Sequence, residues 1–530
     1  MNQIIIDPLV QAQAAVDKAA ASLQGDLDQE QIQLYELAFS QAELDACQAY
    51  SRAAAEQGGT LRARLLEYLV ADTVTTISGR FSRSPGAYGL ELTDLPDCTP
   101  YQAVLDPKNV TELGQLLLEE GLPDVGKLNE EHRLMASTFG QFADEVVAPL
   151  AEEIHREDQI IPDAILNPLR EMGCFGLSVP QRFGGLQPDD AEDSVGMVIV
   201  TEELSRGSLG AAGSLITRPE IMARAIMEGG TDEQKQAWLP QLAAGDPLCA
   251  ISVTEPNTGS DVANVALKAT QVEGGWLLNG AKTWCTFAGK AGLILVLART
   301  NPEAKPAHKG LSLFVVEKPS TDDHAFEVVQ ESGGRMTGRA ISTLGYRGMH
   351  SFEMFYDDFF VPHSHLIGSD AGMGRGFYYT MRGFMGGRLQ TAARACGVMR
   401  AAYDSAVAYT TQREVFGKPV ANYPVSAAKL VRSAALIGAC KALTLEVAHL
   451  MDEGHGAMEA SLVKLVSCRA AEWVTREALQ LYGGMGYAEE TPVSRYFVDA
   501  RVLSIFEGAE ETLAIRVIGK SLIDRQGQGA

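Results

Sequence analysis

The sequence lacks paired cysteines, a surplus of basic residues and an uninterrupted apolar run long enough to cross a membrane. Its eight cysteines are scattered and form no CxxC pair, so they indicate neither a zinc site nor a disulfide framework, and no metal is expected. The first residues carry no basic stretch before an apolar one, so no signal peptide is expected. These absences favour a protein of the reducing cytoplasm that does not associate with a membrane.

The charge balance is strongly acidic, with 44 Lys plus Arg against 68 Asp plus Glu and a formal net charge of -24. Such a surface disfavours nonspecific attraction to nucleic acid and to anionic membranes. A local basic pocket for an anionic substrate remains compatible with it. No strand followed by GxGxxG and a helix occurs, so a dinucleotide-binding Rossmann domain is not expected.

Hydrophobic periodicity divides the chain into four segments, and 530 residues suffice for several separate domains. The stretch 8–80 is rich in Ala, Gln, Glu and Leu and predicts helices, which a turn-rich stretch follows. Helical periodicity returns from about residue 129, short apolar runs then predict strands, and long amphipathic helices close the chain. The predicted fold class is α+β multidomain. The predicted domains are 1–125, an N-terminal helical extension; 126–248, a helical domain; 249–365, a strand domain; and 366–530, a helical bundle.

Two local signals refine this division. Thr231 and Gln234 have the spacing of a capping box at the start of a helix. Asn279 and Gly280 form a dipeptide that is typical of a two-residue hairpin turn. The first signal predicts a helix start at residue 231, and the second predicts a turn between two strands.

Two segments of the strand domain could hold a planar polar group. The stretch 251–261 follows a predicted strand, and Thr254, Ser260 and nearby backbone amides could grip a heteroaromatic ring or a pyrophosphate. In the stretch 280–287, Trp284 could stack on a planar cofactor while Thr286 bonds to its edge. An ordinary turn and the packing of a strand in the core are the alternatives for these two segments.

Two further segments lie in the last helical domain. Arg413 stands near Phe416, which combines a guanidinium able to bind phosphate with an aromatic ring. After Gln480 a helix is interrupted by Gly483 and Gly484, which allow backbone to approach a ligand closely. A solvated helix face and a helix C-cap are the alternatives.

A lone carboxylate stands in an apolar stretch near the end of the chain. Glu507 follows Ile505 and Phe506 and precedes Gly508. Charged side chains rarely lie among bulky apolar neighbours without a use. Burial disfavours the charged form of a carboxylate, and that strengthens it as a base. Glu507 is therefore a candidate general base, and a solvent-facing Glu at a turn between helices is the alternative.

In this order and spacing, the five segments resemble the acyl-CoA dehydrogenase family, from about residue 129 to near the C-terminus. Members of that family combine a helical domain, a β-barrel domain and a C-terminal four-helix bundle, with FAD held at a subunit interface. The resemblance implies this fold with an added N-terminal helical extension. It also implies FAD as cofactor, an acyl-CoA substrate, electron-transferring flavoprotein as electron acceptor, and a homodimer or a dimer of dimers.

The resemblance assigns roles residue by residue. Glu507 matches the catalytic base, which takes the α proton while a hydride leaves the β carbon for flavin N5. Gly387 occupies the position where other members carry the base. The resemblance implies substrate contacts for Ser260 and Arg388. Residues that depart from those usual in the family are Met385, Val415 and Ala514. The implied FAD contacts are Val253, Thr254, Gly259, Ser260, Trp284, Thr286, Arg413, Phe416, Gln480, Gly483, Gly484 and Gly508.

Several segments are similar to the family members that act on methylsuccinyl-CoA, an acyl-CoA with a second carboxylate; they are 203–210, 214–221, 344–350 and 473–504. A buried carboxylate requires a partner. Arg218 lies on a helix whose family counterpart lines the floor of the substrate pocket, so it is the candidate, and a surface Arg before Pro219 is the alternative. A dehydrogenase for a neutral acyl-CoA, an acyl-CoA oxidase and a DNA-binding relative of the fold also remain, the last disfavoured by the acidic charge.

Overall fold

The computed structural model describes residues 3–528, which fall into two compact units. One unit contains the residues up to Ser137 together with those from Thr391 onward, and the other contains Thr138–Gln390. The N-terminal extension therefore belongs to the same unit as the C-terminal bundle, although the two are separated by some 250 residues of sequence. Two helices, α5 (Glu130–Phe142) and α11 (Gly376–Gln412), contain residues of both units.

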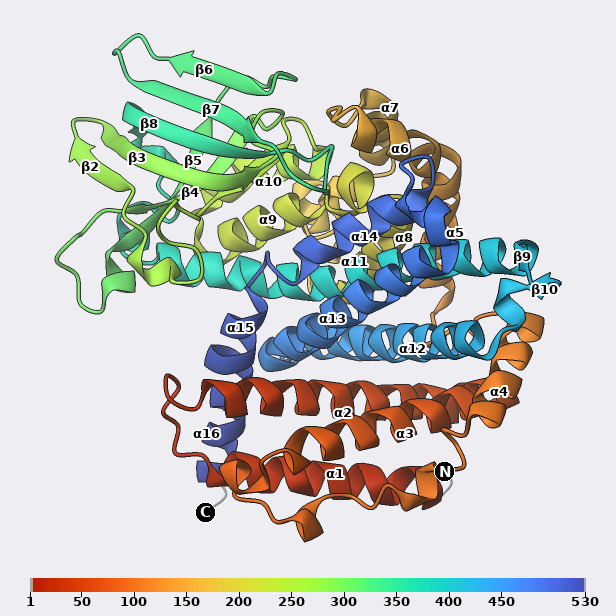
Figure 1. Ribbon diagram of the computed structural model, residues 1–530. Coiled ribbons are helices and arrows are strands. Elements are labelled where there is room, and N and C mark those ends of the chain that lie inside the picture. The colour runs from red at the N-terminus through yellow and green to blue at the C-terminus, as the bar shows by residue number, and fades with distance from the viewer. Residues whose placement is uncertain (1–2, 529–530) are drawn as a thin grey trace. The chain divides into compact units, whose positions relative to one another are not determined.

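The first unit is a helical assembly in which the extension packs on the bundle (Figure 1). Helix α2 lies against α12 and α13, α4 lies against α12, and α1 lies against α16. A short two-stranded hairpin, β9 (Glu414–Val415) with β10 (Lys418–Pro419), follows α11. The other helices are α1 (Gln3–Ser22), α2 (Gln31–Gln57), α3 (Thr60–Ser82), α4 (Pro107–Glu120), α12 (Pro424–Asp452), α13 (Ala457–Tyr482), α14 (Pro492–Leu503), α15 (Glu510–Thr512) and α16 (Lys520–Gln528).

The extension covers an unusually apolar helix of this unit, α12. Its length and composition would let it span a membrane, and no other described helix meets that test, but 72% of its apolar stretch is buried inside the protein. A helix that is apolar on nearly all sides must be covered on all sides by other elements. Helices α2, α3, α4 and α13 all contact α12, so the extension covers surface that the bundle alone would leave exposed.

The extension approaches α12 closely at two glycines. A Cβ atom at Gly114 of α4 would lie 2.7 Å from the Cβ atom of Ala427 on α12. A Cβ atom at Gly438 of α12 would lie 2.9 Å from the ring of Tyr50 on α2. Glycine at these positions lets the helix backbones come together, and any larger residue would force them apart.

We expect Gly114→Ala to lower the free energy of unfolding and Gly79→Ala to raise it. Both glycines lie inside helices of the extension, so each substitution gains about 1 kcal/mol of helix propensity. At Gly114 the added methyl group meets Ala427, and overpacking costs about 1–3 kcal/mol. At Gly79 the space is open. Thermal unfolding followed by circular dichroism gives both melting temperatures, and a higher value for the Gly114 variant would contradict the tight docking of α4.

The second unit combines a helical layer with one large sheet (Figure 1). The sheet has eight strands in the order β1-β4-β2-β3-β8-β7-β6, with β5 paired to β4. Its helices are α6 (Ala148–Arg156), α7 (Asp163–Glu171), α8 (Ser194–Gly207), α9 (Thr217–Gly229) and α10 (Asp232–Ala244). Its strands are β1 (Cys249–Ser252), β2 (Lys268–Val272), β3 (Gly275–Thr286), β4 (Leu293–Arg299), β5 (Leu311–Glu317), β6 (Ala325–Val329), β7 (Arg335–Ile341) and β8 (Ser351–Pro362).

Strand β4 joins the two apolar cores of this unit. Leu293, Leu295 and Leu297 pack with residues of α9 and α10 on one side. Ile294 and Val296 point to the opposite side and pack with residues of β3, β7 and β8. Alternating side chains that are buried on both faces account for the continuous apolar run of this strand.

The structure confirms the capping signal and contradicts the hairpin signal. The side chain of Thr231 accepts from the N–H of Gln234 and the backbone N–H of Thr231 donates to the Gln234 side chain, so α10 begins in a capping box. Asn279 and Gly280 lie inside β3, where the register with β8 shifts at a bulge. Asn279 bonds to Asp358 of β8, and Gly280 has a φ of 136°. The prediction of a turn was wrong because a β-bulge, like a tight turn, favours glycine where the backbone φ angle is positive.

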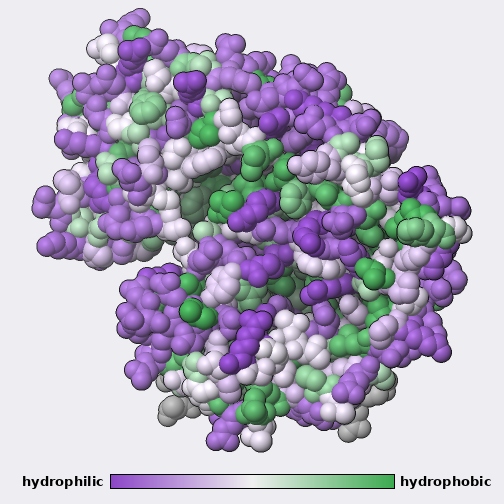
Figure 2. Space-filling model, viewed as in Figure 1, coloured by the Kyte–Doolittle hydropathy of each residue, from purple (hydrophilic) through white to green (hydrophobic). Residues whose placement is uncertain are grey.

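Hydrophilic residues cover most of the face seen in Figure 2. This distribution is expected for a chain with a formal net charge of -24.

Candidate active site

Glu507 lies on the loop between α14 and α15 and is half-buried. Its φ is 53°, and that of Gly508 is 103°, so two consecutive residues have left-handed backbone. Only glycine adopts this conformation without strain, and strained non-glycine residues in folded proteins gather at functional sites. The loop therefore holds the carboxylate of Glu507 in an orientation that a regular helix end would not provide.

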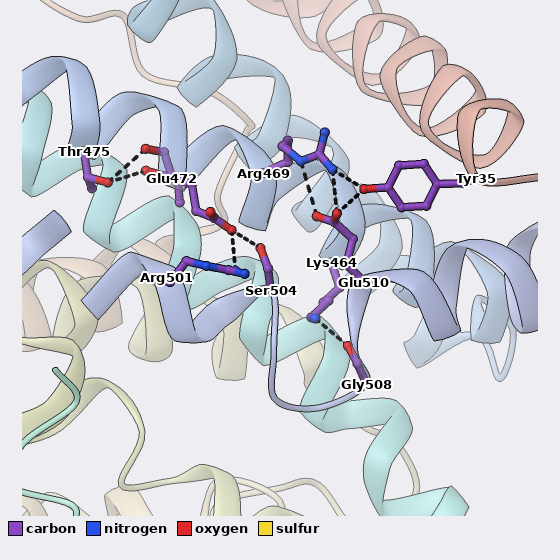
Figure 3. Close-up of polar contacts among 10 residues, drawn as sticks. Tyr35, Lys464, Arg469, Glu472, Thr475, Arg501, Ser504, Gly508 and Glu510 are labelled. Carbon is purple, nitrogen blue, oxygen red and sulfur yellow. Dashed lines mark hydrogen bonds and ion pairs between the residues drawn. The ribbon is translucent and has the colours of Figure 1, made fainter. Parts of the chain in front are cut away.

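Side chains of α13 fix this loop (Figure 3), and a side chain of α11 lies against it. The Nζ of Lys464, which is fully buried, donates to the carbonyl oxygen of Gly508 at 2.7 Å. Glu472 accepts from Ser504 at the start of the loop, and from Arg501 at 3.1 Å. The guanidinium of Arg394 on α11 lies 4.8 Å from the ring centre of Phe506.

The N-terminal extension reaches the same loop through Tyr35 of α2. Its hydroxyl donates to the carboxylate of Glu510, and Arg469 of α13 binds that carboxylate as well (Figure 3). Burial, together with the hydrogen bond to Glu510, raises the pKa of Tyr35 to about 12, so the hydroxyl keeps its proton. The extension thus contacts a residue three positions after the candidate base, a connection that the sequence did not reveal.

In the second unit Trp284 is turned outward from the sheet. The β3–β8 register shifts between Lys282 and Cys285, and Trp284 has a φ of 57° and a side chain that is 54% exposed. Thr286 follows, with its hydroxyl 2.9 Å from that of Ser351 on β8. The bulge therefore presents an indole ring beside a hydroxyl group, and core packing of Trp284 is excluded for this unit.

The segment after β1 is held by a buried ion pair. Lys282 of β3 is fully buried and its Nζ donates to the carbonyl of Val253 and to Glu255, both at 2.8 Å. Glu255 also accepts from the backbone N–H groups of Ala266 and Leu267. Burial lowers the pKa of Lys282, and Glu255 opposes that shift. This pair fixes the backbone of Val253 and Thr254, and removing one partner would leave an uncompensated buried charge.

Gly259 and Ser260 are exposed beyond this anchored part, and a Cβ atom at Gly259 would meet nothing within 4 Å. Arg388 and Gly387 lie on α11, where Arg388 is half-buried and Gly387 is buried. Gly387 has no side chain to act as a base.

The remaining predicted FAD contacts lie in the first unit and are exposed. Phe416 stands at the tip of the β9–β10 hairpin with a φ of 48° and an exposure of 98%, and Arg413 immediately precedes β9. Gln480 ends α13, and neither Gly483 nor Gly484 would bring an added Cβ within 4 Å of another atom. These positions leave an open surface with an aromatic ring, a cation and bare backbone.

Arg218 on α9 is buried, with only 6% of its surface exposed. Its guanidinium donates to the carbonyl of Ser214 at 2.7 Å and to the hydroxyl of Tyr346 at 2.9 Å. Both partners are neutral, and no described carboxylate forms an ion pair with Arg218. Glu220, on the same helix, is already paired with Arg224 at 2.9 Å. The alternative of a surface Arg is therefore wrong, and the structure contains a buried cation without an anionic partner.

Two segments that carry the resemblance to methylsuccinyl-CoA enzymes meet at Arg218, and a third packs against one of them. Tyr346, from the stretch 344–350, has a φ of 60° and supplies the hydroxyl described above. Gly210, from the stretch 203–210, lies so close to Arg347 that an added Cβ would be 2.3 Å from its carbonyl oxygen. Arg218 itself belongs to the stretch 214–221. The tertiary structure thus brings the stretches 214–221 and 344–350 together at Arg218, with the stretch 203–210 packed against the second of them.

Comparison with known proteins identifies the family. Residues 129–246, 250–359 and 374–523 match the models of the acyl-CoA dehydrogenase N-terminal, middle and C-terminal domains. The chain belongs to the acyl-CoA dehydrogenase family. Like other members, it is an FAD-dependent oxidoreductase that acts on a CH–CH bond of an acyl-CoA thioester.

Individual relatives support this assignment over about three quarters of the chain. The (2S)-methylsuccinyl-CoA dehydrogenase of Cereibacter sphaeroides is 43% identical over 399 residues, which cover 75% of this chain and 70% of that protein. The structure of butyryl-CoA dehydrogenase from Megasphaera elsdenii has a TM-score of 0.68 at 28% identity and covers 75% of this chain and 99% of that one. A glutaryl-CoA dehydrogenase from Mycobacterium smegmatis in complex with FADH2 has a TM-score of 0.64 at 26% identity, covering 74% and 95%.

The residues of this acyl-CoA dehydrogenase fit a flavin. An exposed indole on left-handed backbone, a hydroxyl pair and the anchored Val253–Thr254 backbone suit the face and edge of a planar ring. Phe416, Arg413 and the bare backbone of Gly483 and Gly484 suit an adenine ring and a pyrophosphate.

Several of the residues described above, in both units of the dehydrogenase, have left-handed backbone. Nine described non-glycine residues have a clearly positive φ. Four of them, Trp284, Tyr346, Phe416 and Glu507, belong to the groups described above. Tyr346, Tyr35 and the Lys282–Glu255 pair were not predicted from the sequence. Only the fold brings them to Arg218, to Glu510 and to the backbone of Val253. Tyr346 could have been found, since it lies in a segment that already showed the resemblance.

Proposed function

We propose that this acyl-CoA dehydrogenase oxidises (2S)-methylsuccinyl-CoA to mesaconyl-CoA, a step of the ethylmalonyl-CoA pathway, in the cytoplasm. Arg218 is the observation that carries the proposal, because a buried guanidinium with only neutral partners is suited to a carboxylate that arrives with the substrate. The 43% identity to the enzyme of Cereibacter sphaeroides supports the same substrate.

The buried charge of Arg218 favours an acidic ligand over a neutral one. Burying an ion without a counter-charge costs roughly several kcal/mol of free energy, even after the surrounding protein relaxes. The hydroxyl of Tyr346 and the carbonyl of Ser214 hold the guanidinium in place but do not neutralise it. A carboxylate at the far end of the acyl group would recover part of that cost on binding, and a methyl group in the same position would not.

The chemistry follows from the residues of the chain. Glu507 removes the proton from the α carbon, and the backbone N–H of the same residue holds the thioester oxygen while negative charge develops there. One donor of this kind is worth about 3 kcal/mol of transition-state stabilisation. Bound FAD supplies the acceptor for the hydride of the β carbon. Arg218 fixes the far end of the acyl chain and so orients the bond between the α and β carbons.

The proposal includes a partner and an assembly. Phe416 and Arg413 are exposed at and beside the β9–β10 hairpin, which is compatible with FAD contacts made across the interface of a homodimer or a dimer of dimers. Electron-transferring flavoprotein is proposed as the acceptor that reoxidises the flavin.

A substrate panel tests the proposal. Under anaerobic conditions, methylsuccinyl-CoA should bleach the flavin absorbance much faster than isobutyryl-CoA or butyryl-CoA at equal concentration. The ratio of the bleaching rates should be at least about tenfold, because a charge-assisted hydrogen bond contributes roughly 1.5–3 kcal/mol. Bleaching by the neutral thioesters alone would show that the substrate assignment is wrong, while the family activity would stand.

A further inference from the structure

Two histidines and an aspartate gather in the second unit, and none of them is among the predicted site residues. Asp158 lies in the turn after α6, His324 immediately precedes β6, and His350 immediately precedes β8. One ligand atom from each, an imidazole nitrogen or a carboxylate oxygen, lies within 4.8 Å of the other two. The three line a cavity of about 260 Å³. This cluster could not be predicted from the sequence, because its members come from three segments that are far apart in the chain.

The geometry of His350 is that of a prepared ligand. Its Nδ1 lies 3.2 Å from the carbonyl oxygen of Gly348, and its Nε2 lies 3.2 Å from Oδ1 of Asp158. Imidazoles that bind a metal through one nitrogen almost always donate the other N–H to an acceptor such as a backbone carbonyl. His350 is buried, which restricts its ring to this orientation.

His324 has no partner that would explain its place. Its ring centre lies 4.4 Å from that of His350, and the ring forms no hydrogen bond with any described residue. Asp158 has a φ of 52° and His350 one of 35°, so both occupy strained backbone that turns their side chains toward the cavity.

We propose that Asp158, His324 and His350 form a binding site for a divalent transition-metal cation of the Zn²⁺ class. Two imidazoles with one carboxylate are a common ligand set for such ions, and water completes the coordination. Bonds of about 2.0–2.2 Å to a tetrahedral ion space the ligand atoms roughly 3.3 Å apart. The His350–Asp158 contact already has this spacing, and the exposed His324 side chain closes the remaining distance by rotation.

Two arginines near the cavity do not prevent binding. Arg347 is 3.7 Å from Oδ1 of Asp158, but its guanidinium is directed to the backbone carbonyls of Thr343 and His155. Arg339 lines the cavity and is exposed, so its charge is screened by solvent.

The cation would sit directly behind the segment that carries Trp284 and Thr286. The backbone N–H of Phe287 donates to the carbonyl of His350 at 2.8 Å, and Ser351 pairs with Thr286. Binding of the cation therefore fixes the edge of β8 on which that segment rests. The site is structural, and no step of the reaction takes place at it.

Metal analysis of the full-length holoenzyme tests the site. The protein is dialysed against EDTA, then against buffer, and titrated with ZnCl₂ by calorimetry, with bound zinc measured per chain. We expect one tight site in the parent protein and an affinity lowered by more than roughly tenfold in His350→Gln, His324→Gln and Asp158→Asn. Zinc should raise the melting temperature of the parent protein and not that of these variants.

A matched control uses the second His–Asp pair of the same unit. His363 Nε2 lies 3.1 Å from Oδ1 of Asp370, but no second imidazole joins this pair among the described residues. The variant His363→Gln should therefore bind as much zinc per chain as the parent protein. His324 is exposed, so His324→Gln should fold even if substitution of the buried His350 disturbs the protein. The absence of stoichiometric zinc in the parent protein, or equal binding by the parent and His324→Gln, would overturn the proposal.

Discussion

Glu507→Gln keeps FAD bound and slows reduction of the flavin by substrate about 10³-fold, within the roughly 10²–10⁴-fold range for loss of a general base. The amide has the shape of the carboxylate but cannot accept the α proton. Lys464, Glu472 and Arg394 hold the loop through other residues, so the backbone around position 507 should not move. Anaerobic stopped-flow absorbance measures flavin reduction, and the visible spectrum of the purified variant gives its FAD content.

Glu511→Gln is the matched control for this experiment. Glu511 lies four residues further along and is exposed, and its side chain has no hydrogen bond or ion pair to a described residue. Its substitution removes the same charge near the same loop and should leave flavin reduction unchanged. Fast bleaching by the Glu507 variant would show that another group takes the α proton.

Arg218→Met lowers kcat/KM for methylsuccinyl-CoA by about 30- to 5,000-fold, because loss of one partner of a buried charge pair costs roughly 2–5 kcal/mol. Methionine keeps much of the volume of the side chain without its charge. The kcat/KM for isobutyryl-CoA should change by less than about threefold. Steady-state rates with electron-transferring flavoprotein, over a range of both thioesters, measure the two values.

The melting temperature separates a substrate-binding Arg218 from a structural one. A guanidinium that lacks a carboxylate partner destabilises the free enzyme, so Arg218→Met should melt at the same or a higher temperature. Arg335→Gln is the control, because Arg335 is an exposed residue of β7 that pairs with Glu327. Equal losses of kcat/KM for the acidic and the neutral thioester would contradict a role of Arg218 in recognising the carboxylate.

The sequence determined the family and the kinds of residue that carry the chemistry. Local patterns sufficed for the capping box at Thr231, for the apolar strand β4 and for the general order of helices, strands and helices, because these depend on neighbouring residues. The resemblance supplied Glu507 as the candidate base, and Trp284 and the other predicted FAD contacts, by position. The Asn279–Gly280 signal failed, since the same dipeptide suits a bulge inside a strand as well as a turn.

Only the tertiary structure decided what those residues are joined to. The structure shows that Arg218 is buried and that its guanidinium binds only neutral groups, the carbonyl of Ser214 one helical turn earlier and the hydroxyl of the distant Tyr346. Packing likewise brought Tyr35 of the extension to Glu510, and three distant segments to the cluster of Asp158, His324 and His350. Contacts between residues far apart in the chain leave no periodic signal in a single sequence, so these groups appear only after the chain has folded.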